Sequence, residues 1–435
     1  MILVLGGGPA GRMAAIQAAR SGEEVTLVER RSLGGQCLHD GCMQICGLND
    51  IARMIRSAEQ AAALGLTNGA PTVNFRKVMD GLSAIQGKIA GILEEETREA
   101  GVRVLHGAEG AFRDGKVYIN GKETAFDRLI IATGSRPTIP DIPGITLRGV
   151  YTPHTLKEMK DLPGKIAIIG GGVMAAEFAY IFSAFGCETH ILSRSSLLHQ
   201  IPDRLRREAM KDLGGIVLHQ NAAITAITGD DGVTGISYNG STLAVDCVLI
   251  AAGLSPNTAM IEGVAKGPLG EILVDERFET GVPGIFACGD IIGEPCLTPI
   301  ARLRGTAAAS NGGVSSPDIA LAPKSMSLGY EYTWYDSGEE GGTSIHFPGP
   351  AGPGTFWSVP DRKTGVASIR VNADDGRILA FAEASPVAGV MGMYLAYLAK
   401  EGETVGDLSR LIEVHPTSDG MYSLIKYTAG YLKNR

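Results

Sequence analysis

Residues 1–11 read MILVLGGGPAG, and residues 164–175 read GKIAIIGGGVMA. In each stretch an apolar run predicts a buried strand, and three glycines after it predict a tight turn. The first glycine allows the sharp turn, the second lets a pyrophosphate approach the backbone, and the third lets the following helix pack closely on the strand. The sequence therefore predicts two dinucleotide-binding units of one design.

The two units also agree beyond the glycine turn. Each continues through an alanine-rich helix and a second strand, then two hairpin signals and a last apolar strand that ends in glycine. In the first unit these are Arg12–Arg20, Val25–Val28, Asp114-Gly115, Asn120-Gly121 and Leu129–Gly134; in the second they are Ala176–Phe185, Thr189–Leu192, Asp231-Gly232, Asn239-Gly240 and Val248–Gly253.

A proline-rich stretch, residues 136–144, separates the two units, because proline fixes φ and excludes helix. We predict an α/β protein with two Rossmann-like domains, residues 1–146 (completed by 254–315) and residues 147–253. From about residue 316 the pattern changes to strand-like runs, a Gly/Pro-rich loop and two late helices. This third part, residues 316–435, is predicted to be a separate α+β domain.

The residue that ends the second strand indicates which nucleotide each unit binds. Glu29 stands 23 residues after Gly6, where a carboxylate can accept hydrogen bonds from an adenosine ribose. The same spacing from Gly170 leads to Ser193, followed by Arg194. An arginine without the acid suits a ribose 2′-phosphate, which favours NADP over NAD in the second unit.

Charge and hydropathy exclude several classes of partner. The chain of 435 residues has a formal net charge of -8, so neither nucleic acid nor an anionic membrane is expected to bind it broadly. No apolar run reaches the ~18 residues that span a bilayer. Since the first strand begins at the second residue, no cleaved leader is expected, and a cytoplasmic location is predicted.

Two cysteines follow the first unit's second strand. Residues 34–46 read GGQCLHDGCMQIC, so Cys37 and Cys42 stand five positions apart at the start of a predicted helix. Such a pair can close a small disulfide loop, and a helix N-terminus favours the thiolate of the reduced pair. Zinc is the competing interpretation, but the spacing is not CxxC and no second Cys/His pair is present.

Together these motifs resemble the pyridine nucleotide-disulfide oxidoreductases, the family of dihydrolipoamide dehydrogenase, glutathione reductase and mercuric reductase. The resemblance covers nearly the whole chain and includes GGGPAG, Glu29, GGQCxxxxC, Ala132-Thr133-Gly134, the second GGGxxA, Ala252-Gly253, residues 285–290, Leu297-Thr298-Pro299 and His415-Pro416-Thr417.

The resemblance implies a path for electrons. They would pass from NADPH (or NADH) to FAD, then to Cys42 beside the flavin, and from Cys37 to a small disulfide or sulfur substrate. His415 would exchange protons with Cys37, a role that suits an imidazole. In the family this histidine comes from the other subunit, which implies a homodimer with shared active sites, formed by the C-terminal domain.

The resemblance also nominates the residues that hold the two cofactors. For FAD they are Gly6, Gly8, Pro9, Ala10, Gly11, Glu29, Arg30, Gly35, Gln36, Cys37, Cys42, Ala108, Ala132, Thr133, Gly134, Gly289, Asp290, Leu297, Thr298 and Pro299; for NAD(P) they are Gly170, Gly172, Val173, Ser193, Arg194 and Gly253. No metal ligand is predicted.

Three departures leave the substrate open. Cys46 stands where the family has a lysine that pairs with a glutamate, here Glu177, which predicts a lower flavin potential. Cys46 is either a third redox thiol or, as we favour, a small buried residue. The second departure is Gly420, which replaces the glutamate that orients the family's histidine, here His415, and Asp419 beside it is a poor substitute. The third is the loop at 341–357, which matches no family element. Alternative functions are an NAD(P)H oxidase, a metal or quinone reductase, and an electron-transfer subunit of a larger complex.

Overall fold

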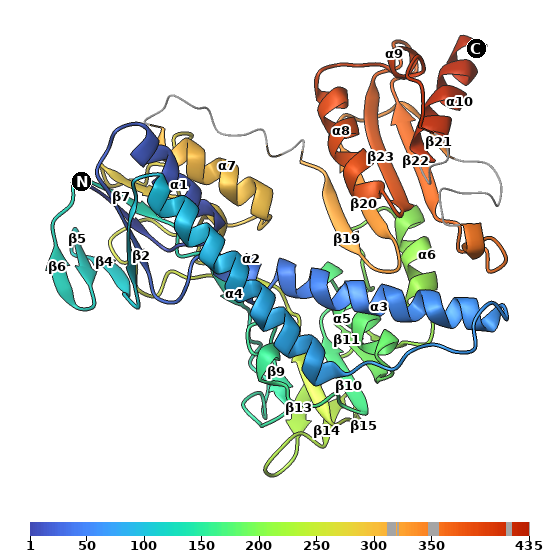
Figure 1. The fold of residues 1–435 in the computed structure, drawn as a ribbon, viewed down its shortest axis with the longest axis horizontal. Coiled ribbons are helices and arrows are strands. Elements are labelled where there is room, and N and C mark those ends of the chain that lie inside the picture. Colours follow the sequence, from blue (N-terminus) through green and yellow to red (C-terminus); the bar gives the residue numbers. More distant parts are fainter. Residues whose placement is uncertain (311–318, 320–321, 347–355, 415–419, 435) are drawn as a thin grey trace.

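The computed structural model describes residues 1–310, 319, 322–346, 356–414 and 420–434 (Figure 1). Its first sheet is parallel, and the strand order is β18-β7-β1-β2-β3. These strands are β1 (Ile2–Leu5), β2 (Val25–Glu29), β3 (Arg103–His106), β7 (Arg128–Ile131) and β18 (Ile285–Ala287). Strand β18 comes from the chain after the second unit, so the first sheet is completed late in the sequence.

The second sheet repeats this arrangement, with the order β12-β11-β10-β16-β9. Its strands are β9 (Val150–Tyr151), β10 (Lys165–Ile169), β11 (Glu188–Ser193), β12 (Val217–Gln220) and β16 (Cys247–Ile250). In both sheets the glycine-turn strand lies between the unit's second strand and its last strand. The predicted α/β class with two Rossmann-like units is confirmed, whereas the exact domain limits remain a prediction.

The helices after the glycine turns begin earlier than predicted. Helix α1 spans Pro9–Arg20 and helix α5 spans Val173–Ala184, each starting directly after its third glycine. The starts expected at Arg12 and Ala176 were wrong because the glycine turn ends in the extended backbone of Gly8 and Gly172, from which a helix can begin at once.

Each unit carries a small antiparallel sheet built on hairpins. Asn120 and Asn239 both have positive φ and are followed by glycines with positive φ, as a two-residue type I′ turn requires. Asp231-Gly232 instead lies in a longer connection between its strands. The strands are β4 (Gly110–Arg113), β5 (Lys116–Ile119), β6 (Lys122–Thr124), β13 (Ile224–Thr228), β14 (Gly235–Tyr238) and β15 (Ser241–Ala244), and β8 (Ser135–Pro137) pairs with β17 (Leu254–Pro256) between the two units.

The C-terminal part is an antiparallel sheet of order β19-β20-β23-β22-β21, which agrees with the predicted α+β pattern. Its strands are β19 (Lys324–Ser327), β20 (Glu331–Asp336), β21 (Thr343–His346), β22 (Val366–Val371) and β23 (Ile378–Ser385). Helices α8 (Ala388–Lys400), α9 (Val405–Leu408) and α10 (Met421–Lys433) share a core with this sheet.

The largest hydrophobic core among the described residues joins the parts of the chain. Helix α3 (Cys42–Ala63) packs on α5, and both share this core with residues of β19 and β20. Helix α4 (Phe75–Glu99) contacts α3, while α6 (Asp203–Asp212) contacts β22 and β23. The N-terminal end of α3, where Cys42 lies, is therefore fixed against the second unit and the C-terminal sheet.

Candidate functional site

A cavity of about 680 Å³ lies where the first glycine turn, the starts of α3 and α7 (Thr298–Ala309), and β19 meet. Most of the residues predicted from the sequence line this one cavity. They are Gly6, Gly8, Pro9, Ala10, Glu29, Arg30, Gly35, Gln36, Cys37, Cys42, Cys46, Ala132, Thr133, Gly134, Val173, Glu177, Gly289, Asp290, Leu297 and Thr298.

The first glycine turn has the shape that a pyrophosphate needs. A Cβ on Gly11 would lie 1.9 Å from the carbonyl oxygen of Gly6, so the helix approaches the strand too closely for any side chain. Helix α1 starts with proline and has no side-chain cap, which leaves its first N–H groups for a phosphate. Glu29 accepts hydrogen bonds from the N–H of Gly7 and of Arg31, both at 2.7 Å. These residues fit the adenosine diphosphate half of FAD.

The second glycine turn repeats this geometry away from the cavity. A Cβ on Gly170 would lie 2.2 Å from the carbonyl oxygen of Ala251, and α5 also begins without a side-chain cap. At the end of β11, the Ser193 hydroxyl is buried and donates to the carbonyl of Ser195, while Arg194 is exposed. Gly170, Gly172, Ser193 and Arg194 do not line the cavity; only Val173 of this group does.

Cys37 and Cys42 are free thiols that share a hydrogen bond at the cavity wall. The sequence suggested that both cysteines lie at the start of one helix, but they do not. Cys37 lies in the short α2 (Gly35–His39), and Cys42 is the first residue of α3. The break occurs because Asp40 and Gly41 leave helical geometry. The Cys42 thiol is 3.6 Å from the hydroxyl of Thr298.

The two thiols are electrostatically unequal. The hydrogen bond from Cys42, opposed by burial and assisted by Thr298 and Arg302, lowers the pKa of Cys37 to about 6. The same hydrogen bond and burial raise the pKa of Cys42. At neutral pH the reduced pair therefore holds one thiolate and one thiol, and the thiolate form is the nucleophile in disulfide exchange.

Cys46 and Glu177 lie on facing helices of the same cavity. Cys46 is exposed to the cavity, so the expectation that it is a buried space-filling residue was wrong; α3 turns this position toward the open volume. Glu177 accepts a hydrogen bond from the N–H of Ser327 at 2.9 Å, and burial raises its pKa to about 8. At neutral pH this carboxyl is mostly protonated, and it needs no lysine partner.

Arg53 lies two helical turns beyond Cys46 and also reaches β19. Its guanidinium donates to the carbonyl of Leu328 at 2.6 Å and to the hydroxyl of Ser327 at 3.0 Å. Ser327 thus contacts both Arg53 and Glu177. Arg53 is thus a cation near Glu177, and its charge opposes the rise in the pKa of Glu177 that burial causes.

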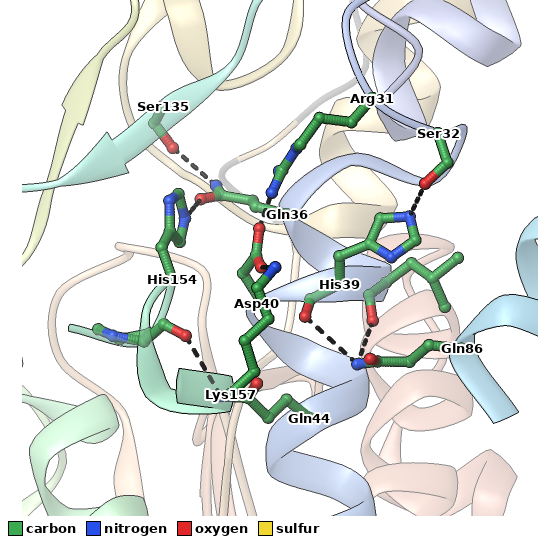
Figure 2. Close-up of polar contacts among 12 residues, drawn as sticks. Arg31, Ser32, Gln36, His39, Asp40, Gln44, Gln86, Ser135, His154 and Lys157 are labelled. Atoms are coloured by element: carbon green, nitrogen blue, oxygen red, sulfur yellow. Dashed lines mark hydrogen bonds and ion pairs between the residues drawn. The ribbon is translucent and has the colours of Figure 1, made fainter. Parts of the chain in front are cut away.

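The loop between the two cysteines is anchored by charge (Figure 2). The buried carboxylate of Asp40 pairs with Arg31 at 2.8 Å and with Lys157 at 3.2 Å. Lys157 lies in the short helix η1 (Leu156–Glu158), beyond the proline-rich linker, so this carboxylate ties the loop to the second unit. From α4, Gln86 donates to the carbonyls of Leu38 and His39.

A second polar network holds the residue next to Cys37 (Figure 2). The Gln36 amide donates to Ser135 at 2.7 Å and to Asp290 at 2.8 Å, and its oxygen is 3.0 Å from Nε2 of His154. Burial lowers the pKa of His154 and raises that of Asp290. Four residues of these networks were not predicted from the sequence: Asp40, Ser135, His154 and Lys157. Asp40 could have been noticed because it lies between the two cysteines, and Ser135 because it directly follows Gly134.

Besides Gly170, Gly172, Ser193 and Arg194, four more of the residues nominated for cofactors do not line the cavity. Ala108 is buried in the core beneath the first sheet, and Gly11 is buried in α1. Pro299 is exposed, while the carbonyl of Gly253 accepts from the N–H of Thr138. His415 and Asp419, predicted as the proton-exchanging pair, lie outside the described residues, as does most of the 341–357 loop.

Two glycine turns that fit dinucleotides and a thiol pair between them define the class of flavoprotein disulfide oxidoreductases. The family model for pyridine nucleotide-disulphide oxidoreductases matches residues 1–305, and the chain belongs to this family. The family uses FAD and NAD(P)H, and the protein is an enzyme of this type.

Individual relatives agree over almost the full chain. Dihydrolipoyl dehydrogenase of Geobacillus stearothermophilus is 30% identical over an alignment of 443 residues, and this alignment covers 95% of this chain and 93% of that protein. Mercuric reductase of Staphylococcus aureus is 28% identical over 94% of this chain and 78% of its own. The solved structure of the HOCl-induced flavoprotein disulfide reductase RclA from Escherichia coli is 24% identical and superposes with a TM-score of 0.84, covering 98% of this chain and 99% of that chain.

Two features are absent from the described residues. No group of three or more His, Cys, Asp or Glu side chains among them is placed to hold a metal ion. Within the same part of the chain, no helix combines the length and the apolar character that crossing a bilayer requires.

Proposed function

We propose that this enzyme uses NADPH to reduce a small disulfide or related sulfur compound through Cys37 and Cys42. The hydrogen-bonded thiol pair on the cavity wall carries the proposal, because its unequal pKa values supply a nucleophile and a resolving thiol side by side. FAD, when bound in this cavity, accepts two electrons from a nicotinamide and makes them available to sulfur.

The exchange needs only the two cysteines and one substrate disulfide. The Cys37 thiolate attacks one sulfur of RS–SR′, forming a Cys37–SR bond and releasing R′S⁻. Cys42 then attacks the Cys37 sulfur, which releases RS⁻ and leaves a Cys37–Cys42 disulfide. Two electrons from NADPH reopen that disulfide, so the sum is RSSR′ + NADPH + H⁺ → RSH + R′SH + NADP⁺.

Residues around the pair would control its position and protonation. Thr298 holds the Cys42 sulfur, and Asp40 fixes the intervening loop between two cations. We propose His415 as the group that takes up and returns the proton of Cys37, because an unperturbed imidazole titrates near neutral pH. Asp419 would orient it.

The preference for NADPH is proposed from the end of β11. Arg194 is exposed, and β11 ends in Ser193 where the first unit has the carboxylate of Glu29. Steady-state kcat/KM should be at least tenfold higher with NADPH than with NADH, and Arg194→Gln should reduce that ratio. A higher value with NADH would contradict the assignment.

A homodimer is proposed from the exposed apolar side chains of the C-terminal part of the chain. Several large apolar side chains are exposed there, which is unusual for a surface without a partner. They are Val390, Met393, Tyr394 and Tyr397 of α8, together with Leu411, Ile412, Val414 and Tyr427. Sedimentation of the wild type and of Tyr397→Glu tests the dimer: the variant should sediment as a monomer, and a monomeric wild type would refute the proposal.

Anaerobic titration with NADPH tests the electron path. The working disulfide and the flavin together take up four electrons, whereas a flavin that acts alone takes up two. Four electrons in the wild type and two in Cys37→Ser and Cys42→Ser would support the proposal. Two electrons in the wild type would instead favour an NAD(P)H oxidase.

A further inference from the structure

The positive charge of Arg302 acts on the thiol that is proposed to meet the substrate. Arg302 lies on α7 four residues after Thr298, so the two side chains share one face of the helix. Thr298 contacts the Cys42 sulfur, and the positive charge of Arg302 helps to lower the pKa of Cys37 after the contributions of Cys42 and Thr298. Arg302 is exposed, and among the described residues no carboxylate forms an ion pair with it.

Two helix N-termini strengthen this positive potential. Cys42 is the first residue of α3, which has 22 residues, and Thr298 is the first residue of α7, which has 12. Neither helix has a side-chain cap at its start. The positive ends of the two helix dipoles therefore lie at Cys42 and at Thr298, whose hydroxyl contacts the Cys42 sulfur.

Three of the carboxyl groups that line the cavity are neutralised or held by hydrogen bonds. Asp40 is buried between Arg31 and Lys157, which neutralise it. Burial keeps Glu177 mostly protonated at neutral pH, and the Asp290 carboxyl accepts hydrogen bonds from Gln36 and Ser135. Arg302 therefore adds a positive charge near the thiol pair, although the chain as a whole carries a formal charge of -8.

We propose that the substrate is an anionic low-molecular-weight disulfide, and that Arg302 binds its carboxylate or phosphate while Cys37 attacks the sulfur. The inference rests on the proposed function and narrows its substrate class. A neutral, apolar disulfide such as lipoamide would leave the guanidinium without a partner. A guanidinium binds a carboxylate or a phosphate through two parallel hydrogen bonds. The enzyme would therefore select substrates by the position of this anion relative to the disulfide.

The test compares disulfides that differ in charge and share a skeleton. The holoenzyme is assayed with NADPH on 3,3′-dithiodipropionic acid and on its neutral diamide. The wild type should show a kcat/KM at least tenfold higher for the diacid. Arg302→Gln should remove that advantage, with a loss of roughly ten- to a hundredfold on the diacid. The loss on the diamide should be much smaller, because it reflects only the contribution of Arg302 to the low pKa of Cys37.

Two further variants separate recognition from general effects. Arg302→Lys keeps the charge and should retain part of the diacid preference. Arg20→Gln removes an exposed cation from the distant end of α1 and should change neither substrate. Assays on oxidised glutathione and on coenzyme A disulfide then distinguish a carboxylate from a phosphate. Only the disulfide that carries the preferred anion should be reduced with a lower kcat/KM by Arg302→Gln than by the wild type.

The outcomes distinguish the inference from the function beneath it. If the wild type reduces diacid and diamide equally well, or if Arg302→Gln slows both alike, the anionic substrate class is wrong while disulfide reduction stands. An equal loss accompanied by weaker dimerisation would place Arg302 in a subunit contact instead. If the wild type reduces neither compound, the proposed function fails and this inference fails with it.

Discussion

Replacing Cys42 by alanine should move the titration of Cys37 to higher pH. The structure attributes the low pKa of Cys37, about 6, first to the hydrogen bond from Cys42. Alanine removes that donor and leaves Thr298 and Arg302 in place. Without the donor, the pKa should rise toward the ordinary thiol value of about 8.5, so the thiolate is lost at neutral pH.

The size of the effect depends on pH in a way that can be calculated. At pH 5.5 about a quarter of the wild-type Cys37 is thiolate, against about 0.1% for a thiol of pKa ~8.5. The more basic thiolate is intrinsically about 13-fold more nucleophilic, for a Brønsted slope of ~0.45. At pH 5.5 Cys37 of the wild type should therefore react up to about 20 times faster than Cys37 of Cys42→Ala. At pH 9.5 the variant should react about 10 times faster than the wild type, and the two curves of rate against pH should cross near pH ~7.4.

Alkylation by iodoacetamide measures this directly. The reduced holoprotein is sampled between pH 5 and 10, and the modified Cys37 peptide is quantified by mass spectrometry. Cys46→Ala, one helical turn away on α3, serves as the control because it leaves the hydrogen bond in place, and its midpoint should stay near 6. A wild-type midpoint near 8.5, or identical profiles for the wild type and Cys42→Ala, would refute the reasoning.

Three further predictions follow from the site. Gly11→Ala should lose most of its bound FAD, because the added Cβ would lie 1.9 Å from the Gly6 oxygen; the flavin absorbance of the purified protein measures this loss. The control Gly81→Ala on α4 should keep its FAD, because the added Cβ meets no atom within 4 Å. Equal FAD content in the two variants would contradict the turn geometry. Asp40→Asn should lower the free energy of unfolding in urea by about 1–3 kcal/mol, a range that allows for hydration of the half-exposed Arg31 and Lys157. The control Asp231→Asn, in an exposed pair with Arg148, should lower it by less than about 0.5 kcal/mol. Similar losses in the two variants would show that burial of Asp40 does not matter. Cys46→Lys should raise the flavin midpoint potential by tens of millivolts, because one added charge at ~5 Å and an effective dielectric of ~20 contributes about 3 kcal/mol over two electrons; a potential that is unchanged or lower in a spectrophotometric redox titration would count against it.

Local pattern was enough to predict the two nucleotide units. Strand, glycines and helix are adjacent in the chain, and their geometry depends on contacts within about 30 residues. The same holds for the hairpins at Asn120-Gly121 and Asn239-Gly240, where positive φ is a property of the turn itself. The predicted helix starts were off by three residues because glycine and proline in the turn concealed where helical hydrogen bonding begins.

The chemistry of the pair depends on residues that are distant in sequence. Thr298 reaches Cys42 across 256 positions, and Lys157 reaches Asp40 across 117. Whether a carboxylate is charged also depends on burial, as for Glu177, whose protonation follows from the packing of α5 against β19. No spacing rule encodes such contacts.

The sequence by itself determined the family, the two dinucleotide folds and the cysteine pair at 37 and 42, because each is given by a contiguous motif with a local physical cause. Only the tertiary structure decided which thiol is the stronger acid, that Cys46 faces the cavity, and that the charge of Arg302 acts on Cys37. These properties arise from electric fields and burial, which depend on distances in space that the order of residues does not specify.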